Sequence, residues 1–155
     1  MLAEGEVAPD FAGRTASGET IRLSQFRGRP VVVYFYPKAK TYGCTRESME
    51  FAHQYPALQA KGAQVIGVSV DDVDAQREFA ETCRLPFPLV ADADREISRS
   101  YGVLGVFGRA RRVTFVLSPD GRVEHVVASA LPGPHAREAM RFLEGTEGAG
   151  PRAPR

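Results

Sequence analysis

The residues from Val31 to Glu47, VVVYFYPKAKTYGCTRE, constrain the fold of this chain more than any other segment. The first six are β-branched or aromatic, which is typical of a strand buried on both faces in the centre of a sheet. A helix is expected to begin at about Cys44, shortly after this strand. The sulfur of Cys44 would then lie near unpaired backbone N–H groups and the positive end of the helix dipole, and both favour thiolate over thiol. The pattern therefore predicts a nucleophilic cysteine.

Composition limits the functions that are open to the chain. With 155 residues, 43% of them hydrophobic, it can form one domain whose core needs no metal or disulfide. Twenty basic and 19 acidic residues give a net charge of +1, too little to favour nucleic acid or an anionic membrane. The N-terminus lacks a secretory pattern, and no apolar run approaches the about 18 residues of a membrane span. We therefore expect a cytoplasmic protein, in which two cysteines indicate redox or catalytic chemistry.

Short apolar runs alternate with segments of helical period along the chain. Strands are expected over 31–36, 64–70, 85–90, 112–117 and 123–128, and helices over 44–59, from Asp71 or Asp72 to about 83, 94–101 and 135–143. A right-handed crossover makes the first two strands parallel, and the turn signal at 118–121 (SPDG) predicts an antiparallel hairpin. A further hairpin is expected over 11–23. This order predicts an α/β, thioredoxin-like fold: three α/β/α layers, a central mixed sheet and an N-terminal hairpin.

Two segments are less regular. Residues 145–155, GTEGAGPRAPR, have little apolar surface to offset the cost of ordering, so we expect a folded domain over 1–144 and a disordered tail over 145–155. Residues 102–110, GVLGVFGRA, combine three glycines with four large apolar side chains. This second segment either covers a cleft or simply docks on the core.

The residues around the cysteine resemble a known family. Pro37, Thr41 and Cys44 reproduce the Pro-x-x-x-Thr-x-x-Cys signature of peroxiredoxins, and YFYPK, Gly-Cys-Thr and PFPLVAD resemble the bacterioferritin-comigratory or peroxiredoxin Q subfamily. Arg112, in an Arg-x-Thr-Phe strand, stands where the family keeps its active-site arginine. The resemblance runs from about Gly5 to Leu143. It implies a thiol peroxidase that reduces hydrogen peroxide and alkyl hydroperoxides without metal or haem, is recycled by a thioredoxin-type reductant and is often monomeric.

Each residue of this constellation suits a step of peroxide reduction. The hydroxyl of Thr41 can orient the O–O bond for attack by the sulfur. The guanidinium of Arg112 can lie beside both the thiolate and the oxygen that gains charge as the bond breaks. Pro37 fixes the loop and, without an N–H, shields the sulfur from water. The family pattern implies that Glu47 orients Arg112.

Each residue also has an ordinary structural interpretation. A lone cysteine at such a junction is more often a small buried apolar residue than a catalyst. Thr41 could simply be a helix N-cap, Glu47 a first-turn acid that complements the helix dipole, and Arg112 one charge of the solvated run 108–112 (GRARR). The combination at this spacing favours catalysis.

The three histidines have no spacing suited to zinc, and two cysteines do not complete a common structural site without two of them. We therefore expect His53, His125 and His135 on the surface and predict neither a metal nor a cofactor.

The second cysteine raises the question of how an oxidised Cys44 would be resolved. Many members of the subfamily carry the resolving cysteine five residues after the first, where this chain has Met49. Others carry it on the next helix, and Cys83 is expected there, about one turn beyond the usual place. The resemblance thus implies an intramolecular Cys44–Cys83 disulfide; the alternative is a one-Cys enzyme resolved by an external thiol. Tyr42 replaces a usual proline, which affects loop rigidity and the mouth of the pocket.

Functions of other classes stay open. A redox-sensing adaptor would use the same thiol but react stoichiometrically, and a non-catalytic thioredoxin-like module would only bind through the segment 102–110. A general disulfide oxidoreductase is disfavoured, because Glu47 occupies the position where a Cys-x-x-Cys motif would place its second cysteine.

Overall fold

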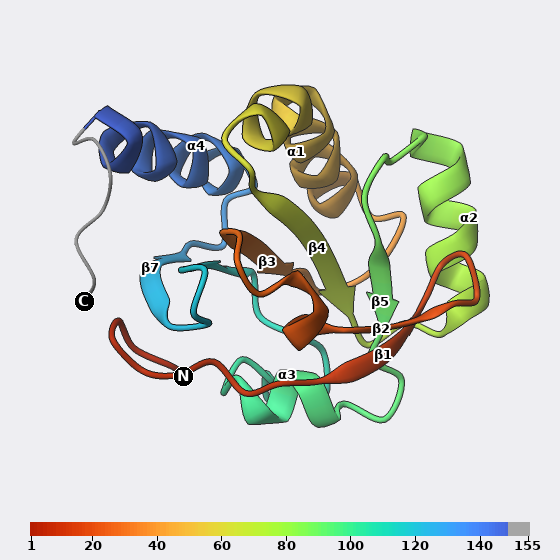
Figure 1. The fold of residues 1–155 in the computed structure, drawn as a ribbon. Coiled ribbons are helices and arrows are strands. Elements are labelled where there is room, and N and C mark those ends of the chain that lie inside the picture. The colour runs from red at the N-terminus through yellow and green to blue at the C-terminus, as the bar shows by residue number, and fades with distance from the viewer. Residues whose placement is uncertain (149–155) are drawn as a thin grey trace.

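The computed structural model describes residues 1–148, and its centre is one mixed sheet (Figure 1). Seven strands lie in the order β2-β1-β5-β4-β3-β6-β7. They are β1 (Ala12–Thr15), β2 (Thr20–Arg22), β3 (Val31–Phe35), β4 (Gln64–Ser69), β5 (Leu89–Ala91), β6 (Val113–Leu117) and β7 (Val123–Ala128). β4 is parallel to β3 and β5, and the remaining pairs are antiparallel. The mixed sheet and the parallel pairing of β3 with β4 are as predicted.

Helices cover both faces of the sheet (Figure 1). On one face lie α1 (Tyr42–Ala60), α2 (Val73–Cys83) and α4 (Gly133–Gly148); on the other lie α3 (Glu96–Ser100), the 3₁₀ helix η1 (Leu23–Phe26) and the N-terminal segment. All five residues of β3 are buried, because alternate side chains enter the two cores. Val32 and Tyr34 pack under α1, whereas Val33 and Phe35 face the α3 side. The predicted three-layer thioredoxin-like architecture is confirmed.

The N-terminal hairpin extends the sheet. β1 and β2 form the predicted hairpin; they are joined by a turn at residues 16–18, where Gly18 adopts a left-handed φ of 90°. β1 also pairs antiparallel with β5, which attaches the hairpin to the parallel part of the sheet.

Several element boundaries differ from the sequence prediction. The strand expected over 85–90 begins only at Leu89, because Pro86 and Pro88 have no N–H to donate to a ladder. The helix expected over 94–101 spans Glu96–Ser100, because the side chain of Asp92 accepts bonds from Ile97 N and Ser98 N and closes its first turn.

The last helix is longer than predicted at both ends. α4 begins at Gly133, since Pro134 is compatible with the first turn of a helix, whose N–H groups have no intrahelical acceptor. It continues to Gly148, so the domain boundary expected at residue 144 falls inside the helix. The rest of the tail expected to be disordered, 149–155, lies outside the described residues.

Residues 1–148 contain neither a helix able to span a bilayer nor a cluster of metal-ligating side chains. None of the helices in this range combines the length and the apolar character that a bilayer span requires. Within the same residues, no three His, Cys, Asp or Glu side chains gather as they would around a metal ion.

Candidate active site

The loop between β3 and α1 is fastened to the end of the neighbouring parallel strand. Ala39 N donates to Asp71 Oδ2 at 2.8 Å, and Ser69 Oγ donates to the same oxygen at 2.7 Å. Lys40 adopts a left-handed φ of 67°, which is unfavourable for a residue with a Cβ. Asp71 therefore holds the loop in a conformation that its own sequence does not favour.

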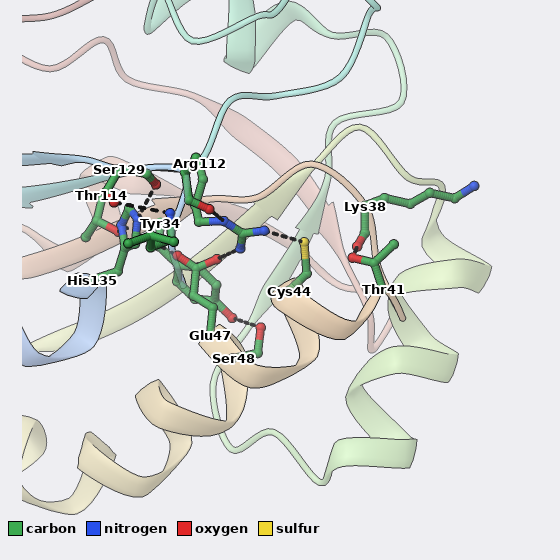
Figure 2. A network of polar contacts seen from close by, with 12 residues as sticks. Tyr34, Lys38, Thr41, Cys44, Glu47, Ser48, Arg112, Thr114, Ser129 and His135 are labelled. Carbon is green, nitrogen blue, oxygen red and sulfur yellow. Dashed lines mark hydrogen bonds and ion pairs between the residues drawn. The ribbon is translucent and has the colours of Figure 1, made fainter. Parts of the chain in front are cut away.

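Thr41 ends this loop and occupies the N-cap position of α1. Its carbonyl oxygen accepts from Thr45 N at 2.8 Å, but its side chain makes no capping bond. The hydroxyl instead donates to the carbonyl oxygen of Lys38 at 2.8 Å (Figure 2). Thr41 is thus the N-cap residue by position, while its side chain belongs to the loop, where it is exposed.

Cys44 is the third residue of α1, which begins two residues earlier than predicted, and it is only 1% exposed. Arg112 Nη2 donates to Cys44 Sγ at 3.6 Å (Figure 2). A Cβ at Gly43 would lie 3.0 Å from the same nitrogen, so a side chain there would crowd the guanidinium. The structure therefore places a cation directly against the sulfur at the start of a helix.

Arg112 is held on three sides. Its Nη1 donates to Glu47 Oε1 at 2.6 Å and its Nε donates to the carbonyl oxygen of Ala130 at 3.1 Å. The side chain is only 11% exposed, so Arg112 is not one charge of a solvated run. Although burial lowers the pKa of Arg112, Glu47 and Cys44 raise it by more, and the guanidinium stays charged.

Glu47 lies one turn after Cys44 on the same face of α1 and is completely buried. Burial raises the pKa of Glu47 from 4.5 to about 8, against the opposing effect of Arg112. The adjacent Ser48 Oγ lies 2.7 Å from Tyr34 Oη, and the Tyr34 ring stacks on Phe51 at 4.3 Å between ring centroids. These contacts fix the face of α1 that carries the site against β3.

His135 lies behind Glu47 and is fully buried, so its predicted place on the surface is wrong. Its Nδ1 lies 2.8 Å from Thr114 Oγ1 and its Nε2 lies 2.8 Å from the carbonyl oxygen of Ser129 (Figure 2). The apolar pattern of α4 contained the signal: His135 precedes the buried Ala139 and Leu143 at four-residue intervals, so it continues their stripe.

The other two histidines lie nearer the surface. His53 is exposed on α1, as predicted, whereas His125 is only partly exposed and stacks on Phe142.

Cys83 is the last residue of α2 and is half-buried. It packs against the same core cluster that contains Cys44, so both cysteines are on one side of the sheet. Burial raises the pKa of the Cys83 thiol. Arg84 follows in a left-handed conformation with φ 50° and ends the helix, and Lys40 Nζ joins the Cys44 loop to Glu78 of α2 at 2.8 Å.

The apolar segment 102–110 forms a small outward loop. Val103 and Ala110 are buried at its two ends, while Val106 and Phe107 at its tip are each 94% exposed. The tip and Pro37 line the same open hollow. Both expectations for this segment hold in part, since its ends dock on the core and its tip borders a hollow beside the active-site loop.

Comparison with known proteins agrees with this geometry. Residues 5–126 match the model of the AhpC/TSA family. The chain belongs to this family. It is 37% identical over 146 residues to the chloroplastic peroxiredoxin Q of Oryza sativa subsp. japonica, covering 92% of this chain and 67% of the relative. It is 35% identical over 150 residues to peroxiredoxin Bcp of Escherichia coli K12, covering 92% and 96%.

The solved structures give the same assignment. Peroxidoxin BcpB of Mycobacterium tuberculosis superposes with a TM-score of 0.89 at 33% identity, covering 94% of this chain and 98% of that one. The bacterioferritin comigratory protein of Xanthomonas campestris, whose structure addresses alkyl peroxide reduction, has a TM-score of 0.83 at 30% identity, covering 88% and 91%. This peroxiredoxin is therefore a thiol peroxidase of the Q or Bcp type, which uses a peroxide substrate and a thiol reductant.

Proposed function

We propose that Cys44 is the peroxidatic residue and reduces hydrogen peroxide and alkyl hydroperoxides. Its thiolate attacks the terminal peroxide oxygen, so that an S–O bond forms as the O–O bond breaks. The sulfur is oxidised to a sulfenic acid, and the departing oxygen takes a proton from solvent and leaves as water or an alcohol. No metal or organic cofactor takes part in this step.

The contact between Arg112 and the Cys44 sulfur is the observation that carries this proposal. A cation fixed by Glu47 and by the carbonyl oxygen of Ala130 cannot turn away as negative charge passes from sulfur to the leaving oxygen. Because the guanidinium is oriented before the substrate arrives, it stabilises that charge without reorganisation. Such a preset donor contributes about 10²–10³ in rate.

Thr41 and Pro37 shape the approach to the sulfur. The one proton of the Thr41 hydroxyl is engaged by Lys38 O, so its free lone pairs are left to accept a bond from the peroxide O–H. This bond would fix the direction of the O–O axis. Pro37 borders the hollow beside the loop tip and offers no N–H that would compete for the sulfur.

We propose further that Cys83 resolves the sulfenic acid within the same chain. The Cys83 sulfur attacks the Cys44 sulfur, a disulfide forms and water leaves, and thioredoxin or a similar dithiol then reduces the disulfide. The Cα atoms must approach within about 7 Å, which requires the start of α1 and the end of α2 to unwind. Both are helix termini with few intrahelical bonds to lose. Such a cycle suits a cytoplasmic monomer, because it needs no second chain.

One observation favours a one-Cys cycle as the second candidate. Burial raises the pKa of Cys83, which lowers the thiolate fraction available to attack the sulfenic acid at neutral pH. In that cycle an external thiol would attack the oxidised Cys44 directly.

Turnover coupled to thioredoxin, its reductase and NADPH tests these proposals. We expect the native chain to consume peroxide over many cycles and Cys83→Ser to consume one equivalent and then stop. Unchanged turnover in Cys83→Ser would establish the one-Cys cycle, and a single equivalent consumed by the native chain would indicate a stoichiometric sensor. Mass analysis of the peroxide-treated protein, with Cys44→Ser as the control, shows whether the two cysteines are joined within one chain.

A further inference from the structure

The carboxyl group of Glu47 has one oxygen without a hydrogen-bond partner. Oε1 accepts from Arg112, but Oε2 is buried and makes no hydrogen bond within the described residues. His135 Nδ1, a group able to share a proton with it, lies 3.5 Å from Oε2. A buried carboxylate oxygen in that position is costly unless it carries or receives a proton.

The contacts of His135 define which ring nitrogen is free. Nε2 faces the carbonyl oxygen of Ser129, which can only accept, so Nε2 carries a proton. In a neutral ring Nδ1 is then an acceptor, to which the Thr114 hydroxyl can donate at 2.8 Å, while Glu47 Oε2 lies 3.5 Å away. Two proton-accepting atoms therefore lie close together inside the protein, and only Oε2 has no donor among the described residues. A proton placed between them would satisfy Oε2.

We propose that Glu47 and His135 share one buried proton at neutral pH, and that His135 is thereby a positioning residue which sets the charge felt by Arg112. The inference rests on the proposed role of Cys44 and adds a residue that no family signature in the sequence had indicated. The proton lies either on Oε2, pointing at Nδ1, or on Nδ1, pointing at Oε2 and Thr114.

Charge balance supports the shared proton. With Cys44 as a thiolate, the buried cluster holds two negative groups, Cys44 and Glu47, against the single positive charge of Arg112. The added proton makes the cluster neutral. Tyr34, from β3, keeps its proton because burial raises its pKa. Arg112 lowers the pKa of His135, and Glu138, on α4, raises it.

Burial affects the two partners in the expected directions. It raises the pKa of Glu47 to about 8 and lowers the pKa of His135, so the carboxyl group holds the proton better than the ring. The proton is retained below about pH 8 and lost above it. After its loss the Glu47 carboxylate competes with the thiolate and the leaving oxygen for Arg112. The rate of Cys44 with peroxide should therefore fall on the alkaline side.

Infrared spectroscopy of the reduced native chain tests the proton directly. The spectrum of the native protein minus that of Glu47→Gln should contain a carboxylic-acid carbonyl band at pH 7 that disappears as the pH rises through about 8. Nitrogen NMR of His135 shows whether the ring instead carries both protons. A carboxylate band together with a singly protonated ring at pH 7 would overturn the proposal, even if peroxidase turnover is normal.

The pH profile of the peroxide reaction tests the role of His135. We expect His135→Gln, which cannot titrate, to move the alkaline inflection of the Cys44 rate constant by about one pH unit or more, a tenfold change in the proton affinity of Glu47. His53→Gln, on the exposed face of the same helix as Cys44, is the matched control and should leave the profile in place. An inflection that stays fixed in His135→Gln would refute the positioning role. Should that variant fail to fold, the infrared and NMR measurements on the native chain still decide the question.

Discussion

The two cysteines of this peroxiredoxin lie in opposite kinds of surroundings. Cys44 is in the first turn of a helix, 1% exposed, with the guanidinium of Arg112 against its sulfur. Cys83 is at the last turn of another helix, half-buried, and burial raises the pKa of its thiol. Both nevertheless pack against one core cluster on one side of the sheet.

This difference separates two physical requirements of a thiol peroxidase. Attack on a peroxide needs a fixed cation and a fixed sulfur, which a closely packed helix start provides. Resolution needs a sulfur that can move, and a helix end is where local opening costs least. A single site cannot be optimal for both. We therefore expect substitutions around Cys44 to change the rate of its reaction with peroxide, and substitutions around α2 to change how easily the end of that helix opens.

The largest effect is expected from removing the first sulfur. Cys44→Ser should lower peroxide consumption by about 10³-fold or more, because a neutral hydroxyl is a much poorer nucleophile than a thiolate. Competition for hydrogen peroxide against a reference peroxidase measures the rate. Cys83→Ser is the matched substitution and should leave the first equivalent of oxidation intact. Equal losses in the two variants would remove the distinction between the cysteines.

Replacing the cation should have the next largest effect. Arg112→Lys keeps the charge but loses the planar group that contacts Cys44, Glu47 and Ala130 at once, so the rate of Cys44 with peroxide should fall about 10²-fold. The same competition assay gives the rate. Arg46→Lys, on the exposed surface of α1, is the control and should behave as the native chain. A lysine variant of full activity would show that only charge matters.

Local spacing was enough to group the residues of the proposed site. Pro37, Thr41 and Cys44 lie within eight residues, so one strand, one loop and one helix start suffice to relate them. Arg112 could be added because it occupies a recognisable strand motif. The structure also brings Glu47 onto Arg112, as the family pattern implied, although this pairing depends on residues 65 positions apart.

The sequence did not predict the supporting contacts, because they join elements far apart in the chain. His135 was expected on the surface, yet it reaches Glu47 only because α4 packs beside α1 on the sheet. Asp71 was considered only as a helix cap, whereas its side chain holds Ala39 in place. The order and type of the elements could be predicted, because the spacing of apolar residues within each segment indicates a helix or a strand. The ends of the elements could not be predicted. Pro86 and Pro88 prevent β5 from beginning before Leu89, and Pro134 allows α4 to begin earlier than expected.

The bond that fastens the Cys44 loop gives a prediction of intermediate size. Asp71→Ala would leave Ala39 N and Ser69 Oγ without their acceptor, so unfolding free energy should fall by about 1–3 kcal/mol. Because Lys40 would no longer be held in its left-handed conformation, the peroxide rate should fall as well. Urea titration and the competition assay measure the two effects. Asp74→Ala, an exposed acid on α2, is the control; the same loss of rate there would mean that loop fixation by Asp71 is not the cause.

The smallest effect is expected from the ion pair that links the two cysteine regions. Lys40 and Glu78 join the Cys44 loop to α2 at 2.8 Å, but their side chains are 48% and 63% exposed, so solvent screens the pair. Glu78→Gln should therefore change unfolding free energy by less than about 1 kcal/mol. In the proposed cycle Cys44 and Cys83 leave their helices to meet, so even this small loss should accelerate disulfide formation, by less than about fivefold. Mass analysis of samples quenched after one equivalent of peroxide gives that rate. A slower disulfide in Glu78→Gln would show that the pair guides the two regions together, and resolution would then depend on an ordered approach rather than on opening alone.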